Sequence, residues 1–128
     1  MSIERLTTNP ASGFSDAVTT AGPGRTIHVS GNVGFGEGST TVVSGGMEAE
    51  ARATFANIER TLRTLGADLS HVVKINAFIT DLSLYGEYAK VRGELFGDGP
   101  PASATVQVSG LLVGAQIEID AVAFIPEG

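Results

Sequence analysis

The chain contains no cysteine and only two histidines among its 128 residues. Without cysteine it has no disulfide, no thiolate nucleophile and no thiolate metal ligand. Two histidines without a set of suitably spaced carboxylates give no metal motif. We therefore expect neither a bound metal nor another cofactor.

Basic residues are also scarce, with 8 Lys and Arg against 14 Asp and Glu and a net charge of −6. This balance disfavours nucleic acid as a partner, because phosphate binding depends on neutralisation by Lys and Arg. No apolar run approaches the roughly 20 residues that span a membrane, and the N-terminus lacks the apolar core of a secretory signal. We therefore expect a cytoplasmic protein that does not bind a membrane.

The composition is otherwise that of an ordinary folded chain, with 42% apolar and 17% charged residues. The length suffices for one hydrophobic core, and neither a repeat nor a linker divides the sequence. Residues 1–128 are therefore expected to form a single domain.

Apolar spacing predicts two helices. From Met47 to Leu65 the apolar residues recur at intervals of four and three, with Ser44 as the expected N-cap and Gly66 after the last turn. A second and weaker pattern predicts a helix that ends before Gly97. Its expected apolar stripe is Leu84, Tyr88, Val91 and Leu95.

Alternation of apolar and polar residues predicts strands at 26–30, 41–43, 71–80, 100–108 and 117–123. Packing both helices on one sheet face gives a two-layer α+β domain with a mixed sheet. The helix-facing positions are expected to be Ile27, Val29, Val73, Ile75, Ala77, Ile79, Ala104, Val106, Val108, Ile117, Ile119, Ala121 and Ala123. The opposite face is expected to carry His28, Ser30, Lys74, Asn76, Phe78, Ser103, Thr105, Gln107, Glu118, Asp120 and Phe124. Since that face mixes polar and apolar groups, we expect it to meet other subunits.

Several segments, taken together and in this order, resemble one family. They are residues 13–18 (GFSDAV), 27–34 (IHVSGNVG), 57–58 (NI), 66–74 (GADLSHVVK), 80–82 (TDL) and the two C-terminal strands. The chain resembles the Rid (reactive intermediate deaminase, YjgF-like) family, which is also labelled L-PSP endoribonuclease or translation inhibitor. The resemblance implies a chorismate-mutase-like fold, a homotrimeric barrel and a small-molecule cleft at each subunit interface. It also implies hydrolysis of 2-imino or 2-enamino acids to 2-oxo acids and ammonia.

Carried onto this sequence, the resemblance places Phe14, Ser30, Gly31, Ser103, Thr105 and Asp120 in the cleft. Asp120 stands where the family has Glu and would handle the water, and Phe14 stands where many members have Tyr. Ser103 occupies the position of the Arg that grips the substrate carboxylate. A hydroxyl in place of a guanidinium forfeits about 1.5–3 kcal/mol of charge-assisted hydrogen bonding. We therefore predict inefficient hydrolysis of ordinary 2-imino acids.

Two further residues are candidates for the site. Glu118 lies two positions before Asp120 on the same strand face, and Arg92 lies on the second helix, from which it could reach a neighbour's cleft. The interpretation that the cleft lacks a fixed cation would be overturned by a guanidinium from elsewhere in the chain beside Ser103.

Three functions stay open from the sequence. The first is a hydrolase that acts on an enamine, an imine or a related reactive metabolite. The second is a trimer that binds a ligand or serves as a scaffold without catalysis, which the missing Arg favours. The third is an endoribonuclease or translation inhibitor, against which the acidic charge weighs, as does the lack of a nucleophile–base pair.

Overall fold

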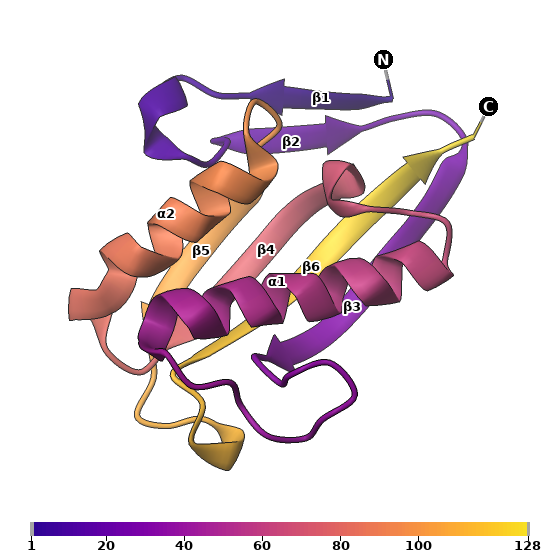
Figure 1. Ribbon diagram of the computed structural model, residues 1–128. Coiled ribbons are helices and arrows are strands. Elements are labelled where there is room, and N and C mark those ends of the chain that lie inside the picture. Colours follow the sequence, from indigo (N-terminus) through magenta and orange to yellow (C-terminus); the bar gives the residue numbers. More distant parts are fainter. Residues whose placement is uncertain (1, 128) are drawn as a thin grey trace.

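A computed structural model of the chain describes residues 2–127 and shows a four-stranded sheet with two helices across one face (Figure 1). The strands run in the order β3-β6-β4-β5, with β4 and β5 parallel and the other pairs antiparallel. A separate antiparallel pair, β1 and β2, precedes this sheet. The elements are β1 (Ile3–Leu6), β2 (Ala17–Thr20), β3 (Gly24–Val33), α1 (Gly46–Thr64), β4 (Val72–Ile79), α2 (Tyr85–Phe96), β5 (Ala102–Gln107) and β6 (Ile117–Pro126). The predicted α+β class with a mixed sheet is confirmed.

Helix α1 forms where the apolar spacing predicts it. Ala51, Phe55, Ile58 and Leu62 from the predicted stripe are at most 1% exposed. The predicted N-cap is wrong, because Gly45 rather than Ser44 occupies that position, with φ of 116° and no side-chain cap. Gly66 follows the last turn with φ of 84°, a conformation that glycine adopts without steric cost.

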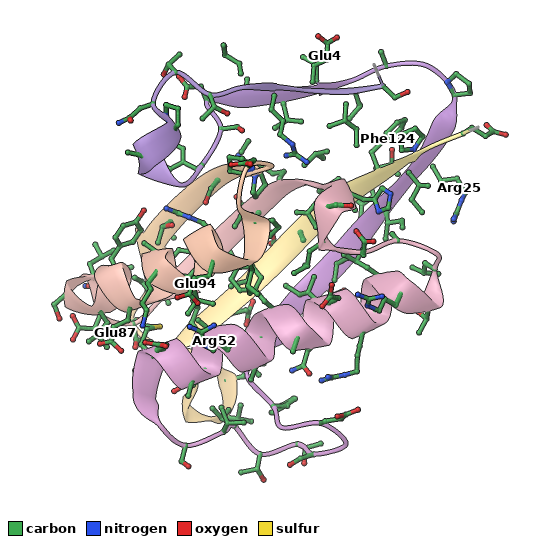
Figure 2. The ribbon with its side chains drawn as sticks, turned by 45° about the horizontal axis from the view of Figure 1, so that its top comes forward. Glu4, Arg25, Arg52, Glu87, Glu94 and Phe124 are labelled. Carbon is green, nitrogen blue, oxygen red and sulfur yellow. The ribbon has the colours of Figure 1, made fainter. Side chains whose placement is uncertain are left out.

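Helix α2 is rotated relative to its predicted stripe. Tyr88 and Val91 are buried as expected, but Leu95 is 39% exposed and Arg92 and Phe96 are buried instead. The reason lies in packing between the helices, because the Phe96 ring meets Phe55 of α1 edge to face at 5.5 Å. Above this contact the helices are bridged at the surface. Figure 2 shows Arg52 of α1 and Glu94 of α2 lying together, and these side chains form an ion pair.

The side chains of strand β5 point to the opposite faces of the sheet from those that alternation predicts. It pairs in parallel with β4 so that Ser103 is opposite Ile75 and Thr105 is opposite Ala77. Since paired residues share a sheet face, Ser103 and Thr105 point to the helix side with the buried Ile75 and Ala77. The assignment of these two residues to the opposite face is therefore wrong. On the helix side, the phenol oxygen of Tyr88 from α2 lies close to the Ser103 and Thr105 hydroxyls and to Arg92.

The face away from the helices, here called the open face, consequently carries apolar groups from β5. Val106 is 47% exposed there, opposite Phe78 of β4 in the ladder. Val122 and Asp120 of β6 belong to the same face, since they pair with β4 residues that alternate with its buried positions. The open face is thus more apolar than the alternation of apolar and polar residues predicts.

Three smaller differences from the predicted strands concern single segments or residues. A register shift at the start of β4 buries Val72 rather than the predicted Val73. Residues 41–43 form no strand and make only an isolated bridge between Phe35 and Val42. Phe124, predicted on the exposed face, is 7% exposed and lies near the end of β6 beside β3 (Figure 2).

Candidate functional site

The residues predicted for the site fall into two groups on different faces and edges of the sheet. The first group lies on the helix side of edge strand β5, and we call it the β5 half-site. Its predicted members are Phe14, Arg92, Ser103 and Thr105, and they are joined by Tyr88, which was predicted only as part of the apolar stripe of the second helix. The second group belongs to edge strand β3 and its neighbour β6, and we call it the β3 half-site. Its members are Ser30, Gly31, Glu118 and Asp120. Within one protomer the structure does not bring the two groups together.

The β5 half-site depends on a loop that follows β1. The Ser15 hydroxyl donates to the carbonyl of Pro100 at 2.6 Å, and the Ser15 amide donates to the carbonyl of Pro101 at 2.9 Å. Arg5 also donates to the Pro100 carbonyl, at 2.9 Å. These bonds fix the loop against the start of β5 and thereby place the ring of Phe14 beside helix α2.

Arg92 lies inside this half-site and is 1% exposed. Its Nη2 donates to the Ser12 carbonyl at 3.2 Å and to the Tyr85 hydroxyl at 3.0 Å. Its Cζ lies 5.2 to 5.6 Å from three ring centroids, those of Phe14, Tyr85 and Tyr88. Arg92 therefore sits in its own protomer at the β5 edge.

Three buried polar atoms of the half-site have no hydrogen-bond partner among the described residues. They are Tyr88 Oη, Arg92 Nε and Ser103 Oγ. Burial raises the pKa of Tyr88, whereas Arg92 and the hydroxyls of Ser103 and Thr105 act in the opposite direction because they lie close to the phenol oxygen. Such clustering of unpartnered buried groups is uncommon in folded proteins and is typical of a place where water or a ligand binds.

The β3 half-site carries carboxylates instead. Asp120 of β6 accepts a hydrogen bond from the Asn76 side-chain amide at 2.9 Å, which orients its carboxylate on the open face. Gly31 lies at a register shift in β3, close enough to Glu118 that a Cβ there would stand 2.5 Å from Glu118 Oε2. A side chain at this position would therefore displace the Glu118 carboxylate.

A cavity of about 220 Å³ adjoins the β3 half-site. Part of its wall is a loop that the sequence analysis missed, in which Leu112 is 78% and Val113 is 61% exposed. Val113 has φ of 55°, which is strained for a β-branched residue. Three consecutive apolar side chains between Gly110 and Gly114 were the available signal. The wall consists of Gly31, Asn32, Val33, Phe35, Leu112, Val113 and Glu118.

Neither histidine supports nucleophilic catalysis by Ser103. His28 belongs to β3, at the other edge of the sheet, and His71 Nδ1 accepts from the backbone amide of Asp68 in the turn before β4. Over residues 2–127 no three His, Asp or Glu side chains are placed to hold a metal ion. In the same part of the chain, no helix has the length and apolar character needed to cross a bilayer.

The fold defines a small α+β protein whose candidate site residues lie toward both edges of one sheet. The chain belongs to the endoribonuclease L-PSP family, whose sequence profile matches residues 5–125, and the predicted resemblance to Rid proteins is confirmed. It is 38% identical to protein DfrA of Myxococcus xanthus, over 78% of this chain and 76% of that one. It is 35% identical to human 2-iminobutanoate/2-iminopropanoate deaminase, over 77% of this chain and 72% of that one. The structure of RidA from the Antarctic bacterium Psychrobacter sp. PAMC 21119 superposes with a TM-score of 0.76 at 29% identity, covering 98% of this chain and 99% of that one.

Proposed function

We propose that the protein is a Rid-type hydrolase that releases ammonia from an imine or enamine of a small metabolite. The observation that supports this proposal is the division of the candidate residues into two chemically different groups. The β5 half-site holds a cation and hydroxyls, and the β3 half-site holds the Asp120 and Glu118 carboxylates. Hydrolysis needs both kinds of group, one to bind the substrate and one to direct water.

The two halves would meet if copies of the chain associate through their open faces, as in a closed homotrimer. Uncovered apolar groups on that face, including Val106 and the half-buried Phe78 and Val122, favour such an association. In a ring of identical contacts, one edge of each subunit meets the other edge of the next. This arrangement would place β3 of one copy beside β5 of its neighbour.

Within the assembled site, Asp120 is proposed to act on water. Its carboxylate accepts a proton as the water oxygen bonds to the electrophilic carbon of the imine. Return of that proton to the nitrogen gives the carbinolamine. The remaining hydroxyl proton is then passed by the same carboxylate to the nitrogen as the carbon–nitrogen bond breaks, so that a carbonyl compound and ammonia leave. Asn76 serves as a positioning residue, because its amide holds one carboxylate oxygen at 2.9 Å.

The first prediction concerns Asp120→Asn, which keeps the size of the side chain but removes its basicity. We expect the rate of ammonia release from imines generated in place to fall by about 10²–10⁴-fold, the usual contribution of a general base. Glu87→Gln, at an exposed carboxylate on α2, is the matched control and should retain most of the rate. A rate unchanged in Asp120→Asn would remove the proposed role.

A ligand-binding trimer without catalysis is the second candidate function, favoured by the hydroxyl of Ser103 at the family's Arg position. It predicts that the wild-type protein binds small organic acids and releases no ammonia from any imine. The family description also names an endoribonuclease, and RNA cleavage that persists through rigorous purification would support that activity instead.

A further inference from the structure

Glu118 is a half-buried carboxylate without a cationic partner among residues 2–127. It forms no ion pair with any described Lys, Arg or His. Asp120, two positions along the same strand face, is held by the Asn76 amide, but no hydrogen bond within residues 2–127 reaches the carboxylate of Glu118. A carboxylate in such a place is stabilised by a donor that carries positive charge. The Glu118 carboxylate is therefore available to a ligand.

Glu118 lines the cavity of about 220 Å³ at the β3 half-site, and the other polar side chain of the wall also presents an acceptor. The Asn32 amide nitrogen donates to the Ser30 carbonyl at 2.9 Å. Since a carbonyl can only accept, this bond identifies the nitrogen end of the amide and leaves its oxygen as an unused acceptor. No Lys, Arg or His belongs to the wall. The wall therefore offers acceptors and one negative charge.

The rest of the wall is apolar, with side chains from Val33, Phe35, Leu112 and Val113. An apolar cavity of about 150 Å³ is large enough to hold benzene. The cavity of about 220 Å³ therefore has room for a benzene-sized body beside a small polar head. A metal ion does not suit these walls, because hard cations take about six to eight oxygen ligands.

The two sides of the cavity lie at the same end of the sheet, where Figure 1 shows the loop after β3 and the turn before β6. On the first side, Asn57 of α1 donates to the carbonyls of Val33 and Phe35 at 3.1 and 3.0 Å, which fixes that wall. On the other side, Val113 has a left-handed backbone beside the exposed Leu112. Strained residues with exposed apolar side chains are concentrated at sites that bind ligands.

From these features we infer that the cavity binds a small organic cation, with an ammonium head at Glu118 and an apolar body against the Leu112–Val113 loop. An ammonium group carries donors and a positive charge, which match the carboxylate and the amide oxygen. A ligand carboxylate in the same place would be repelled by Glu118. The inference goes beyond the proposed hydrolysis and does not rest on it, because binding of an amine breaks no bond.

The rival explanation is that Glu118 pairs with a basic residue of a second copy, since Glu118 also belongs to the open face. The two explanations predict different effects of Glu118→Gln. Pairing between copies predicts a lower solution mass for this variant and no change in its affinity for amines. An amine site predicts an unchanged mass and a lower affinity.

The test is titration of the full-length protein with benzylamine, which is protonated at neutral pH, and with the neutral isostere benzyl alcohol. The methyl signals of Leu112 and Val113 in NMR spectra report binding at this cavity. We expect benzylamine to bind about 10- to 100-fold more tightly than benzyl alcohol, because its hydrogen bond to the carboxylate is charge-assisted. Glu118→Gln should remove this preference and leave binding of benzyl alcohol unchanged. Glu37→Gln, at an exposed carboxylate in the loop after β3, is the matched control and should change neither affinity.

Leu112→Ala tests the apolar wall and should fold normally, since Leu112 is 78% exposed. It should weaken binding of both ligands by the same factor, about 3- to 10-fold. Equal affinities of the wild type for the two ligands, or binding of neither, would overturn the site. A lower mass of Glu118→Gln with unchanged amine affinity would also overturn it.

Ammonia release from imines is measured on the same wild-type sample, so that the two proposals fail separately. Release of ammonia without binding of benzylamine would overturn the amine site and leave the proposed hydrolysis in place. Binding of benzylamine that depends on Glu118, without ammonia release, would support the amine site and remove the proposed hydrolysis.

Discussion

At the scale of single residues, Tyr88 shows how the site departs from an ordinary core. Its ring packs with Phe55 and Tyr85, as a core residue does, but its hydroxyl has no partner among the described residues. Burial of an unpaired hydroxyl opposes folding. The Tyr88 oxygen therefore lies among the polar groups of Arg92, Ser103 and Thr105 rather than in a purely apolar core.

A prediction on alkaline stability follows from Tyr88, whose pKa is raised by burial. Below the ordinary tyrosine pKa of about 10 both the folded and the unfolded chain keep the proton, so the stability is fully present. As the pH rises above that value the unfolded chain loses the proton first, and stability falls by up to about 1.4 kcal/mol per pH unit.

Urea unfolding between pH 8 and 11 should show a steeper loss of stability with pH in the wild type than in Tyr88→Phe. The half-buried Tyr85 gives the control substitution, Tyr85→Phe, which should leave the slope unchanged, and equal slopes in all three proteins would contradict the prediction.

At the scale of elements, the contact between β3 and α1 is set by a glycine. A Cβ at the buried Gly34 would lie 2.7 Å from the carbonyl oxygen of Glu50, which is backbone and cannot yield as a side chain does. The backbone directly after β3 consequently lies closer to α1 than it could if residue 34 carried a Cβ.

We predict that Gly34→Ala destabilises the protein by about 1–3 kcal/mol through overpacking, measured by chemical unfolding. Gly36→Ala is the matched control, because its nearest new neighbour would be the Val43 side chain at an ordinary 3.7 Å. The control should change stability by less than about 0.5 kcal/mol. Equal effects of the two substitutions would show that the approach of β3 to α1 is not tight.

The elements also show what sequence alone could predict. Helix α1 was predictable because four of its apolar positions, from Ala51 to Leu62, all face one core. For β5, alternation identifies which residues share a face but not which face meets the helices, and the usual assumption that polar residues face outward fails here. It fails because α2 turns Arg92 and Tyr88 toward this edge strand, and nothing in the spacing of α2 predicts that rotation.

The same limit explains the candidate site. Most of the candidate residues were proposed from the resemblance, and Glu118 was correctly predicted to share a face of β6 with Asp120. The separation of Ser103 from Asp120 by the thickness of the sheet depends on the reversed β5. The Leu112–Val113 loop has no periodic pattern, so its position beside Gly31 could come only from the structure.

At the scale of the whole molecule, a single copy of the chain does not bring its candidate site residues together. Its cation and its carboxylates lie on different faces and at different edges of the sheet, and its open face exposes apolar side chains. Small soluble proteins rarely leave such a surface uncovered unless another chain covers it. Association of identical copies explains both observations together.

The most direct test of this claim is the solution mass of the protein by sedimentation velocity at micromolar concentration. We predict a mass of three copies for the wild type and of one copy for Val106→Asp, which places a charge on the open face. Leu95→Asp, at a residue 39% exposed on α2, is the control and should leave the assembly intact. A wild-type chain that sediments as a single copy at these concentrations would contradict the account.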